Sequence, residues 1–269
     1  MNPASSASLV LPALTLWQRE MVRFLRQRDR VVGALLTPVV FWLLLGLGLG
    51  RSFHAPGLAS DHGYLEYFFA GTLLMILLFT AIFSTISVIE DRREGFLQGV
   101  LVAPVAPGGL VLGKILGGAT LALGQGLVFV LLAPTVHLHL GLAAAGWLTA
   151  MMFLIAFGLT GLGFIVAWPL DSTQGFHAIM NLFLLPLWFL SGALFPPSGA
   201  PAWLQWVMKC NPLSYGLAAL RQGLYWDQPP TAEWLPTRTV TLLVNAGFAV
   251  AMLAVASIMA RRTTRGDLL

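Results

Sequence analysis

Six long apolar segments constrain what this chain can fold into more than any other feature of its sequence. Each has close to the ~20 mostly apolar residues that an α-helix needs to cross the hydrocarbon core of a bilayer. Only helices and closed barrels can cross, because every backbone N–H and C=O group needs a partner inside the protein. The runs are continuous and lack period-2 alternation, so the sequence predicts an all-α integral membrane protein. The six spans are expected at about 31–50, 67–89, 110–134, 146–168, 175–195 and 239–260.

The composition also argues against a soluble protein. Hydrophobic residues make up 57% of the 269 positions, charged residues only 10%, and the mean hydropathy is +0.81. Soluble domains carry about 25% charged residues, so this chain cannot cover a water-exposed surface of its size. The net charge of +4 is explained by basic residues that flank membrane spans, and no nucleic-acid partner is expected. The single cysteine, Cys210, excludes an intrachain disulfide and a metal site built from cysteines.

The distribution of Lys and Arg predicts the orientation of the spans. An even number of spans places both termini on one side of the membrane. That side, with the loops 90–109 and 169–174, holds eleven of the fifteen basic residues. The opposite side holds Arg51, Lys209, Arg221 and Arg238. The positive-inside rule therefore predicts a multi-pass protein of the cell (inner) membrane with both termini in the cytosol.

Residues 11–30, ahead of the first span, have the pattern of a basic amphipathic helix. One helical face collects Leu14, Trp17, Met21, Phe24 and Leu25, and the opposite face collects Arg19, Glu20, Arg23, Arg26, Gln27 and Arg30. Such a helix lies in the plane of the lipid headgroups. Its expected interfacial residues are Trp17, Arg19, Arg23 and Arg26. The alternative is a cytosolic helix packed on a partner protein, and the two interpretations are compatible.

Residues 196–236, between the fifth and sixth spans, differ from the apolar runs. Seven prolines interrupt the segment, and six Trp and Tyr residues give it the character of an interfacial aromatic belt. Its apolar stretch 213–226 is too short to cross a bilayer. We expect a re-entrant or surface-lying helix pair on the outer face. No internal repeat is visible, so 1–269 is predicted to form a single transmembrane domain.

Residues 90–105, after the second span, combine charge with exposed apolar character. A dense cluster of five charged residues, 90–94, precedes a short, partly apolar helix expected at 95–103, which Pro104 and Pro107 end. A solvated loop is the simpler interpretation, but it has little need for a succession of apolar residues. A short helix of this kind is typical of segments that dock into a groove of another protein.

Residues 108–115, GGLVLGKI, nearly match the phosphate-binding pattern G-x-x-x-x-G-K-[ST]. Ile115 stands where the Mg²⁺-binding hydroxyl is required, and no strand precedes the glycines. We therefore expect no nucleotide, catalytic or metal site on this chain. Gly108 and Gly109 are expected to form the turn before the third span, and Lys114 to anchor it at the cytosolic surface. Gly113 and Gly117 are expected to permit close packing of helices.

These features together resemble the ABC-2 type transporter permeases. Many of them carry E-R-E-x-G-T-L-E-x-L-L-x-T-P after the second span, followed by G-K-I. The residues that match are Glu94, Gly95, Leu97, Leu101, Val102, Pro104, Gly113, Lys114 and Ile115, and those that depart are Phe96, Gln98, Gly99 and Ala103. The stretches 189–201 and 211–215, with Arg221, also resemble the family, so the likeness extends over essentially the whole chain.

The resemblance implies a non-catalytic transport subunit of a bacterial exporter. Two permease subunits, here expected to be a homodimer, pair above two copies of a cytosolic ABC ATPase, which binds ATP and Mg. No cofactor is expected on this chain itself. The segment 90–105 becomes a coupling helix seated in the ATPase. Its coupling residues are expected to be Glu90, Asp91, Arg92, Arg93, Glu94, Gly95, Phe96, Leu97, Gln98 and Leu101.

The resemblance also places the substrate path between the two subunits, lined by spans one, two and five. Aromatic residues of these spans suggest an apolar or amphipathic cargo: a drug, lipid, glycolipid or lipid-linked glycan. The candidates are Phe41, Trp42, Phe79, Phe83, Phe183 and Trp188. The main alternative is a membrane-embedded lipid- or isoprenoid-modifying enzyme, which requires acidic or His clusters at a membrane face. An ion-coupled transporter requires ionisable residues within the spans, which the sequence does not show.

Overall fold

The structure is a computed structural model that describes residues 10–49, 63–96, 99, 107–227 and 235–266. All of the regular secondary structure in these ranges is helical. The α-helices are α1 Val10–Arg26, α2 Arg28–Leu49, α3 Tyr64–Ser84, α4 Ile86–Arg93, α6 Pro107–Val130, α7 Leu142–Ala167, α8 Thr173–Phe189, α9 Ala202–Cys210, α10 Pro212–Leu224 and α11 Arg238–Gly266. Two short 3₁₀ helices, η1 Ala133–Val136 and η2 Pro197–Gly199, connect them.

Five helices in the described part of the chain are long and apolar enough to cross a membrane. Their segments are Val32–Leu49, Tyr64–Arg93, Pro107–Val130, Leu142–Ala167 and Arg238–Arg262, at the positions of five of the six predicted spans, and the second of them joins α3 and α4 into one continuous segment. The predicted span 175–195 corresponds to α8, which has only 17 residues and contains Pro186. The apolar run continues beyond α8, but its backbone turns at Gly192, where φ is +88°. The helix therefore ends six residues before the expected boundary.

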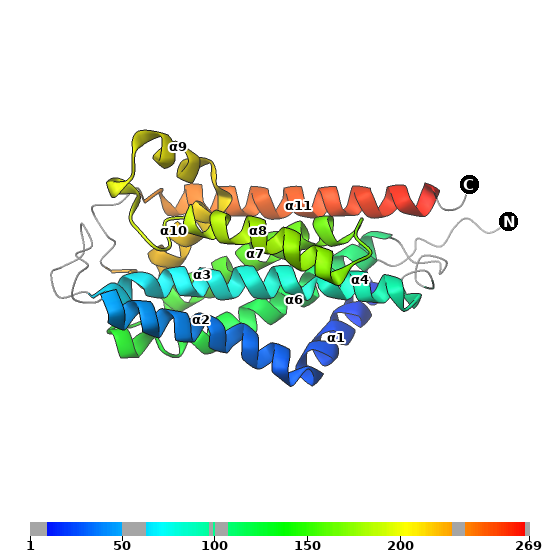
Figure 1. The fold of residues 1–269 in the computed structure, drawn as a ribbon, viewed down its shortest axis with the longest axis horizontal. Helices are drawn as coiled ribbons and strands as arrows, with labels where there is room; N and C mark the ends of the chain where they lie inside the picture. The colour runs from blue at the N-terminus through cyan, green and yellow to red at the C-terminus, as the bar shows by residue number, and fades with distance from the viewer. Residues whose placement is uncertain (1–9, 50–62, 97–98, 100–106, 228–234, 267–269) are drawn as a thin grey trace.

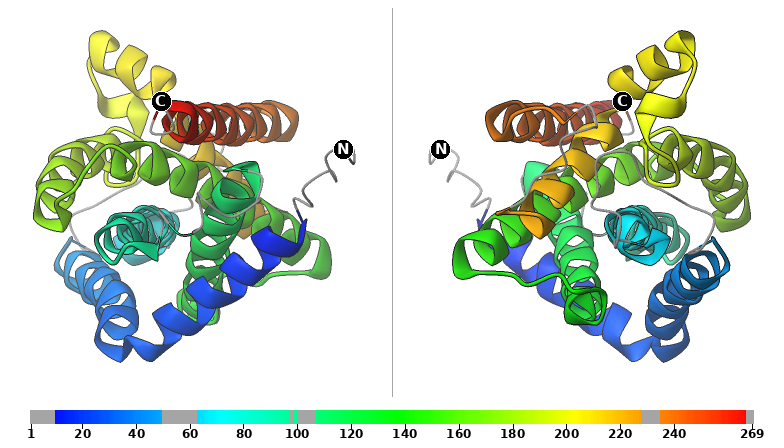
Figure 2. Two further views of the ribbon diagram at one scale, coloured as in Figure 1. Left: turned by 90° about the vertical axis from the view of Figure 1, so that its right-hand side faces the viewer. Right: turned by 90° about the vertical axis from the view of Figure 1, so that its left-hand side faces the viewer.

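The long helices run side by side along one axis, and α3 lies in the middle of them (Figure 1, Figure 2). It packs against α2, α6, α7, α8 and α10, and nearly all of its side chains are buried. Two tryptophans fix its position, because each indole N–H donates to a backbone oxygen of α3. Trp188 donates to Gly71 O at 2.9 Å, and Trp42 donates to Leu65 O at 2.8 Å.

The bundle has two distinct ends. α1, α4 and the C-terminal end of α11 lie at one end, and α9 and α10 lie at the other (Figure 1). We call these the α4 end and the α10 end. The sequence predicts that the charged segment, which follows the second span, and the aromatic segment, which precedes the last span, lie on opposite sides of the membrane. In agreement with this order, the structure places them at opposite ends of the bundle.

The N-terminal helix packs differently from the prediction. α1 ends at Arg26 and α2 already begins at Arg28, so the predicted segment 11–30 contains a helix break. The buried residues of α1 are Ala13, Leu16, Glu20 and Phe24, of which the first three lie against α6, whereas Leu14 and Leu25 are exposed. Glu20 was expected on the exposed polar face and is 6% exposed. The assignment was wrong for Glu20 because a lysine of α6 lies opposite it.

The segment before the last helix forms the predicted helix pair. α9 is peripheral, with Trp203 and Trp206 both more than two-thirds exposed. α10 instead inserts between α7, α11 and α3 and buries most of its side chains. Asn211 joins the two helices. Its Oδ1 accepts from Leu213 N at 2.9 Å and caps α10, and its Nδ2 donates to Leu187 O at 2.7 Å. Residues 228–234 of the predicted segment lie outside the described ranges.

Candidate functional site

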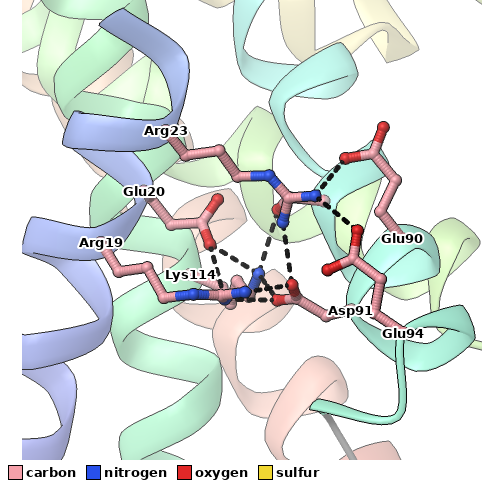
Figure 3. A network of polar contacts seen from close by, with 8 residues as sticks. Arg19, Glu20, Arg23, Glu90, Asp91, Glu94 and Lys114 are labelled. Carbon is pink, nitrogen blue, oxygen red and sulfur yellow. Dashed lines mark hydrogen bonds and ion pairs between the residues drawn. The ribbon is translucent and has the colours of Figure 1, made fainter. Parts of the chain in front are cut away.

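The charged cluster 90–94 lies at the end of α4 and on Glu94, the residue after it. Its acidic and its basic side chains point toward different parts of the bundle. The acidic residues face α1 and α6, where they form an ion-pair network (Figure 3). The two arginines face the connection between α7 and α8. The cluster therefore joins four parts of the bundle at the α4 end.

Asp91 is the centre of the network and its side chain is fully buried. Its two oxygens accept a bidentate pair of hydrogen bonds from Arg19, at 2.7 and 2.8 Å. Arg23 donates to Asp91 Oδ1 at 2.8 Å, and Lys114 also donates to this carboxylate. Three cations from two other helices thus converge on one carboxylate of α4. Bidentate Arg–carboxylate contacts are strong and fix orientation as well as distance.

Lys114 occupies the interior of the network and not the membrane surface. Its side chain is 3% exposed, and its ammonium donates to Glu20 Oε1 at 2.6 Å and Ser87 Oγ at 3.1 Å as well as to Asp91. The expectation that Lys114 anchors the third span by reaching the cytosolic surface is wrong. The carboxylates of α1 and α4 lie within its reach, and a buried charge is stable only when it is paired in this way.

The outer part of the network is partly exposed. Arg23 donates to Glu90 Oε2 at 2.7 Å and lies 3.6 Å from Glu94 Oε1. The Arg19 guanidinium lies 3.8 Å from the centre of the Phe96 ring, a cation–π contact. Its hydrogen bonds to Asp91 raise the pKa of Arg19 above its ordinary value.

The arginines of α4 hold the α7–α8 connection. Arg92 donates to Trp168 O and, at 3.3 Å, to Asp171 Oδ1, and Arg93 Nε donates to Asp171 O at 2.7 Å. Ser172 then caps α8 by accepting from Gly175 N at 3.2 Å. α4 is therefore tied by hydrogen bonds to the start of α8 as well as to α1 and α6.

Gly95 is the point at which the chain leaves α4. Its φ of +74° lies in the left-handed region, which non-glycine residues rarely adopt. Phe96 follows and contacts Arg19. Three of the predicted coupling residues, Leu97, Gln98 and Leu101, lie outside the described residues.

Gly113 of the GKI motif and the nearby Gly117 explain how α1 reaches the network. A Cβ atom on Gly113 would lie 2.7 Å from Ala13 O, and one on Gly117 would lie 2.8 Å from Glu20 Cβ. Both positions therefore need glycine for α1 to pack this closely on α6, as the spacing predicted. Gly108 and Gly109 already belong to the first turn of α6, so the expected turn before the span is wrong.

The four predicted interfacial residues take different positions on α1. Arg19 and Arg23 belong to the network, and Arg26 is exposed. Trp17 is half-buried against α6, where its indole N–H donates to Thr120 Oγ1 at 3.1 Å. The sequence reasoning missed Glu20 and Lys114 as partners. The available signal was a single lysine inside an apolar run, directly after Gly113 and three residues before Gly117.

An apolar groove of about 420 Å³ lies between α2, α3 and α8. Phe79 and Phe83, two of the predicted path residues, line it and contact each other with ring centres 5.7 Å apart. Phe24, Pro38 and Met75 add apolar surface, and the His177 ring lies 4.9 Å from that of Phe83.

The other predicted path residues lie elsewhere. Phe41 is 37% exposed and contacts Trp188, which is fully buried. Trp42 is buried against α3, and Phe183 is 62% exposed on α8. Only Phe79 and Phe83 are thus brought together in one groove. Within the described ranges, no group of three or more His, Cys, Asp or Glu residues is arranged to hold a metal ion.

Comparison with known proteins adds a family and several relatives. The family model for the ABC-2 type transporter matches residues 13–225. Nodulation protein J of Sinorhizobium fredii (strain NBRC 101917 / NGR234) is 28% identical, over 82% of this chain and 85% of that protein. The daunorubicin resistance ABC transporter permease protein DrrB1 of Streptomyces coeruleorubidus is 26% identical, over 84% and 81%. The putative transport permease ycf38 of Cyanophora paradoxa is 27% identical, over 82% and 76%.

Proposed function

This chain belongs to the ABC-2 type transporter family, as a transmembrane transport permease, and from that membership we propose that it is the membrane subunit of an ATP-driven exporter. The ATPase is a separate cytosolic ABC subunit, present in two copies, which holds ATP and Mg. This chain receives the force of ATP binding and hydrolysis and has no catalytic role of its own.

The observation that carries the proposal is the ion-pair network at the α4 end. It joins α1, α4 and α6 through a carboxylate with no exposed surface, directly beside the expected ATPase-docking segment. Interactions of this kind leave few alternative arrangements, because separating any one partner leaves a buried charge unpaired. A push on the segment after Glu94 is therefore expected to move these helices together rather than bend the loop.

The proposed topology has six crossings, with both termini in the cytosol and the α10 end outside. In this arrangement α8 is the fifth crossing. Its 17 residues give a helix roughly 26 Å long at 1.5 Å per residue. The apolar residues of the turn that follows α8 would lengthen the part of the chain that crosses the membrane. In the first and in the last span, only 17% of the most apolar stretch is buried within the chain. The exposed surfaces of α2 and α11 would therefore face lipid or a second copy of the chain in a homodimer.

The proposed cargo is apolar or amphipathic. The groove beside Phe79 and Phe83 offers aromatic and aliphatic surface with a few polar groups, which is the usual lining of small-molecule sites. One relative is named for resistance to the drug daunorubicin. A drug, lipid, glycolipid or lipid-linked glycan fits this chemistry.

Co-purification tests the proposal directly. The full chain, expressed at natural levels and extracted in mild detergent, is expected to elute with an ABC ATPase. The reconstituted pair is expected to hydrolyse ATP faster than the ATPase alone. If the chain elutes alone and converts a lipid substrate without ATP, it is the membrane-embedded enzyme instead.

A valine at Gly95 is expected to uncouple the transporter. A β-branched residue is unfavourable by roughly 1–2 kcal/mol at a left-handed φ, so the chain would leave α4 in another direction. We expect Gly95→Val to insert normally but to transport at least tenfold more slowly per ATP hydrolysed. Gly95→Asn is the matched control, because asparagine tolerates this conformation and should retain most of the transport. Wild-type coupling in the valine variant would contradict the role given to this turn.

Replacing Phe83 by serine tests the groove. Loss of an aromatic contact with a bound apolar cargo is expected to raise the KM for transport by about tenfold. Phe183→Ser is the control, because it removes the same ring from an exposed position of α8 outside the groove. Uptake of a fluorescent apolar drug into inverted vesicles would measure both. Equal effects of the two changes would exclude the groove as the cargo site.

A further inference from the structure

One histidine lies in the apolar groove between α2, α3 and α8. His177, in the second turn of α8, is exposed and lines the groove beside Phe79 and Phe83. Of the described residues that line the groove, none is Asp, Glu, Lys or Arg, and His177 is the one that can titrate. Its imidazole is therefore chemically distinct from the rest of the lining.

The contacts of His177 within the chain are with aromatic rings. Its imidazole lies 4.9 Å from the centre of the Phe83 ring and 6.5 Å from that of Phe176. In the part of the chain that the structure describes, neither ring nitrogen has a hydrogen-bond partner. A neutral imidazole carries one donor and one acceptor. A polar group beside apolar surface costs free energy until it is hydrogen-bonded, so His177 is available to a ligand in the groove.

The hydroxyl groups of α3 in the groove are engaged within the protein. Thr80 donates its hydrogen to Gln125 Oε1, and Ser84 donates to Ala81 O at 2.7 Å. Thr37 adds a further hydroxyl from α2. On the side formed by α3 and α8, the imidazole of His177 is thus the main group that can donate a hydrogen bond to a ligand.

The charge of the lining narrows the ligand. A charged group that entered the groove would lose its hydration without meeting an opposite charge on Asp, Glu, Lys or Arg in the described lining. An uncharged hydroxyl or carbonyl group loses less, and one hydrogen bond to His177 compensates for it. The groove therefore favours a polar group that carries no charge.

The aromatic residues narrow the ligand further. The rings of Phe79, Phe83 and His177 contact one another in that order, with centres 5.7 and 4.9 Å apart. Aromatic rings favour stacked or edge-to-face contacts with other rings. The volume of about 420 Å³ lies within the range of sites for drug-sized molecules, so the groove has room for fused rings.

We propose that His177 determines cargo specificity, by hydrogen-bonding the hydroxyl or carbonyl group of an uncharged aromatic molecule that packs on Phe79 and Phe83. The proposal rests on the export function for the identity of the ligand as cargo. Among the classes of cargo named above, it selects aromatic molecules with an uncharged polar group. Phe79 and Phe83 bind the rings, and His177 distinguishes molecules that carry the polar group from those that lack it.

A matched series of pyrenes tests the proposal on the full chain in phosphatidylcholine nanodiscs. Saturable energy transfer from tryptophan to the pyrene ring measures binding, and empty nanodiscs correct for partition into lipid. We expect hydroxypyrene to bind about tenfold more tightly than pyrene, the effect of one hydrogen bond. Pyrenecarboxylate and pyrenemethylammonium, the anion and the cation of the series, are expected to bind at least tenfold more weakly than hydroxypyrene.

His177→Phe keeps an aromatic ring in the groove and removes both ring nitrogens. We expect this variant to bind pyrene as the wild type does and to lose the tenfold preference for hydroxypyrene. Unchanged affinity for pyrene would show that the groove is intact. His139→Phe is the matched control, because it makes the same change at an exposed position outside the groove, and it should retain the preference.

Three results would overturn the proposal. They are the absence of a preference for hydroxypyrene in the wild type, an unchanged preference in His177→Phe, and binding of either charged probe as tight as that of hydroxypyrene. Equal weakening of pyrene and hydroxypyrene by His177→Phe would also contradict it, because it would assign a structural role to His177. Binding needs neither ATP nor the ATPase, so these failures would leave the export function standing. Conversely, failure to co-purify an ATPase would refute the export function and leave recognition by His177 in place.

Discussion

Replacing Asp91 by asparagine is expected to cost about 3–5 kcal/mol of unfolding free energy, the typical cost of removing one partner from a buried ion pair. Asparagine keeps the shape but removes the charge that Arg19, Arg23 and Lys114 share. Lys114 would then keep only Glu20 as an ionic partner, in a position that is nearly closed to water. Denaturant unfolding of the detergent-solubilised protein, followed by tryptophan fluorescence, would measure the loss.

A double-mutant cycle separates the network from a general effect of mutation. Lys114→Met alone leaves Glu20 and Asp91 without their shared cation, and is expected to be as damaging as Asp91→Asn. The double variant removes one charge of each sign, so it should be markedly more stable than the sum of the two losses predicts. Arg26→Gln on the exposed side of α1 should change stability by less than about 0.5 kcal/mol. Additive losses in the cycle would show that the two residues do not interact.

Valine at Gly113 is expected to detach α1 from α6. Its Cβ would approach the backbone oxygen of Ala13 to 2.7 Å and the Cβ of Leu16 to 2.8 Å, and backbone cannot rotate away as a side chain does. Overpacking of this kind costs about 1–3 kcal/mol, and relief by movement of α1 would also pull Glu20 from Lys114. We expect transport to fall at least tenfold while ATP hydrolysis persists.

Gly124→Val is the matched control for Gly113→Val. It adds the same side chain to the same helix, at a position where a Cβ meets no other atom within 4 Å. A disulfide engineered between α1 and α6 should form readily in the control and poorly in Gly113→Val. Rapid cross-linking and normal transport in Gly113→Val would refute the tight fit of α1 that the geometry describes.

The broad architecture was predictable because it depends on the length and polarity of segments. Continuous apolar runs identified five membrane-capable helices, and the prolines around Asn211 identified the α9–α10 pair. α8 was placed correctly but ended too late, because a hydrophobicity pattern continues through Ser191 and Gly192 although the backbone turns there.

The candidate site was predictable only in part, because its chemistry depends on contacts between distant segments. The sequence marked 90–94 as important and Gly113 as a packing residue. It could not show that α1 is the helix that packs there, since Glu20 and Lys114 lie 94 residues apart. An amphipathic pattern assigns charged residues to solvent by default, so Glu20 and Lys114 were both placed in the wrong environment.

The same separation has a consequence for how the protein is made. At a synthesis rate of about 5–20 residues per second, Glu20 emerges roughly 5 to 20 seconds before Lys114. During that interval the glutamate has no buried cation to meet, and a lone carboxylate resists entry into the membrane interior. We therefore expect α1 to dock on the bundle only after α6 has been made. On this expectation, the Glu20–Lys114 ion pair forms only after the first three long apolar helices, α2, α3 and α6, have been made.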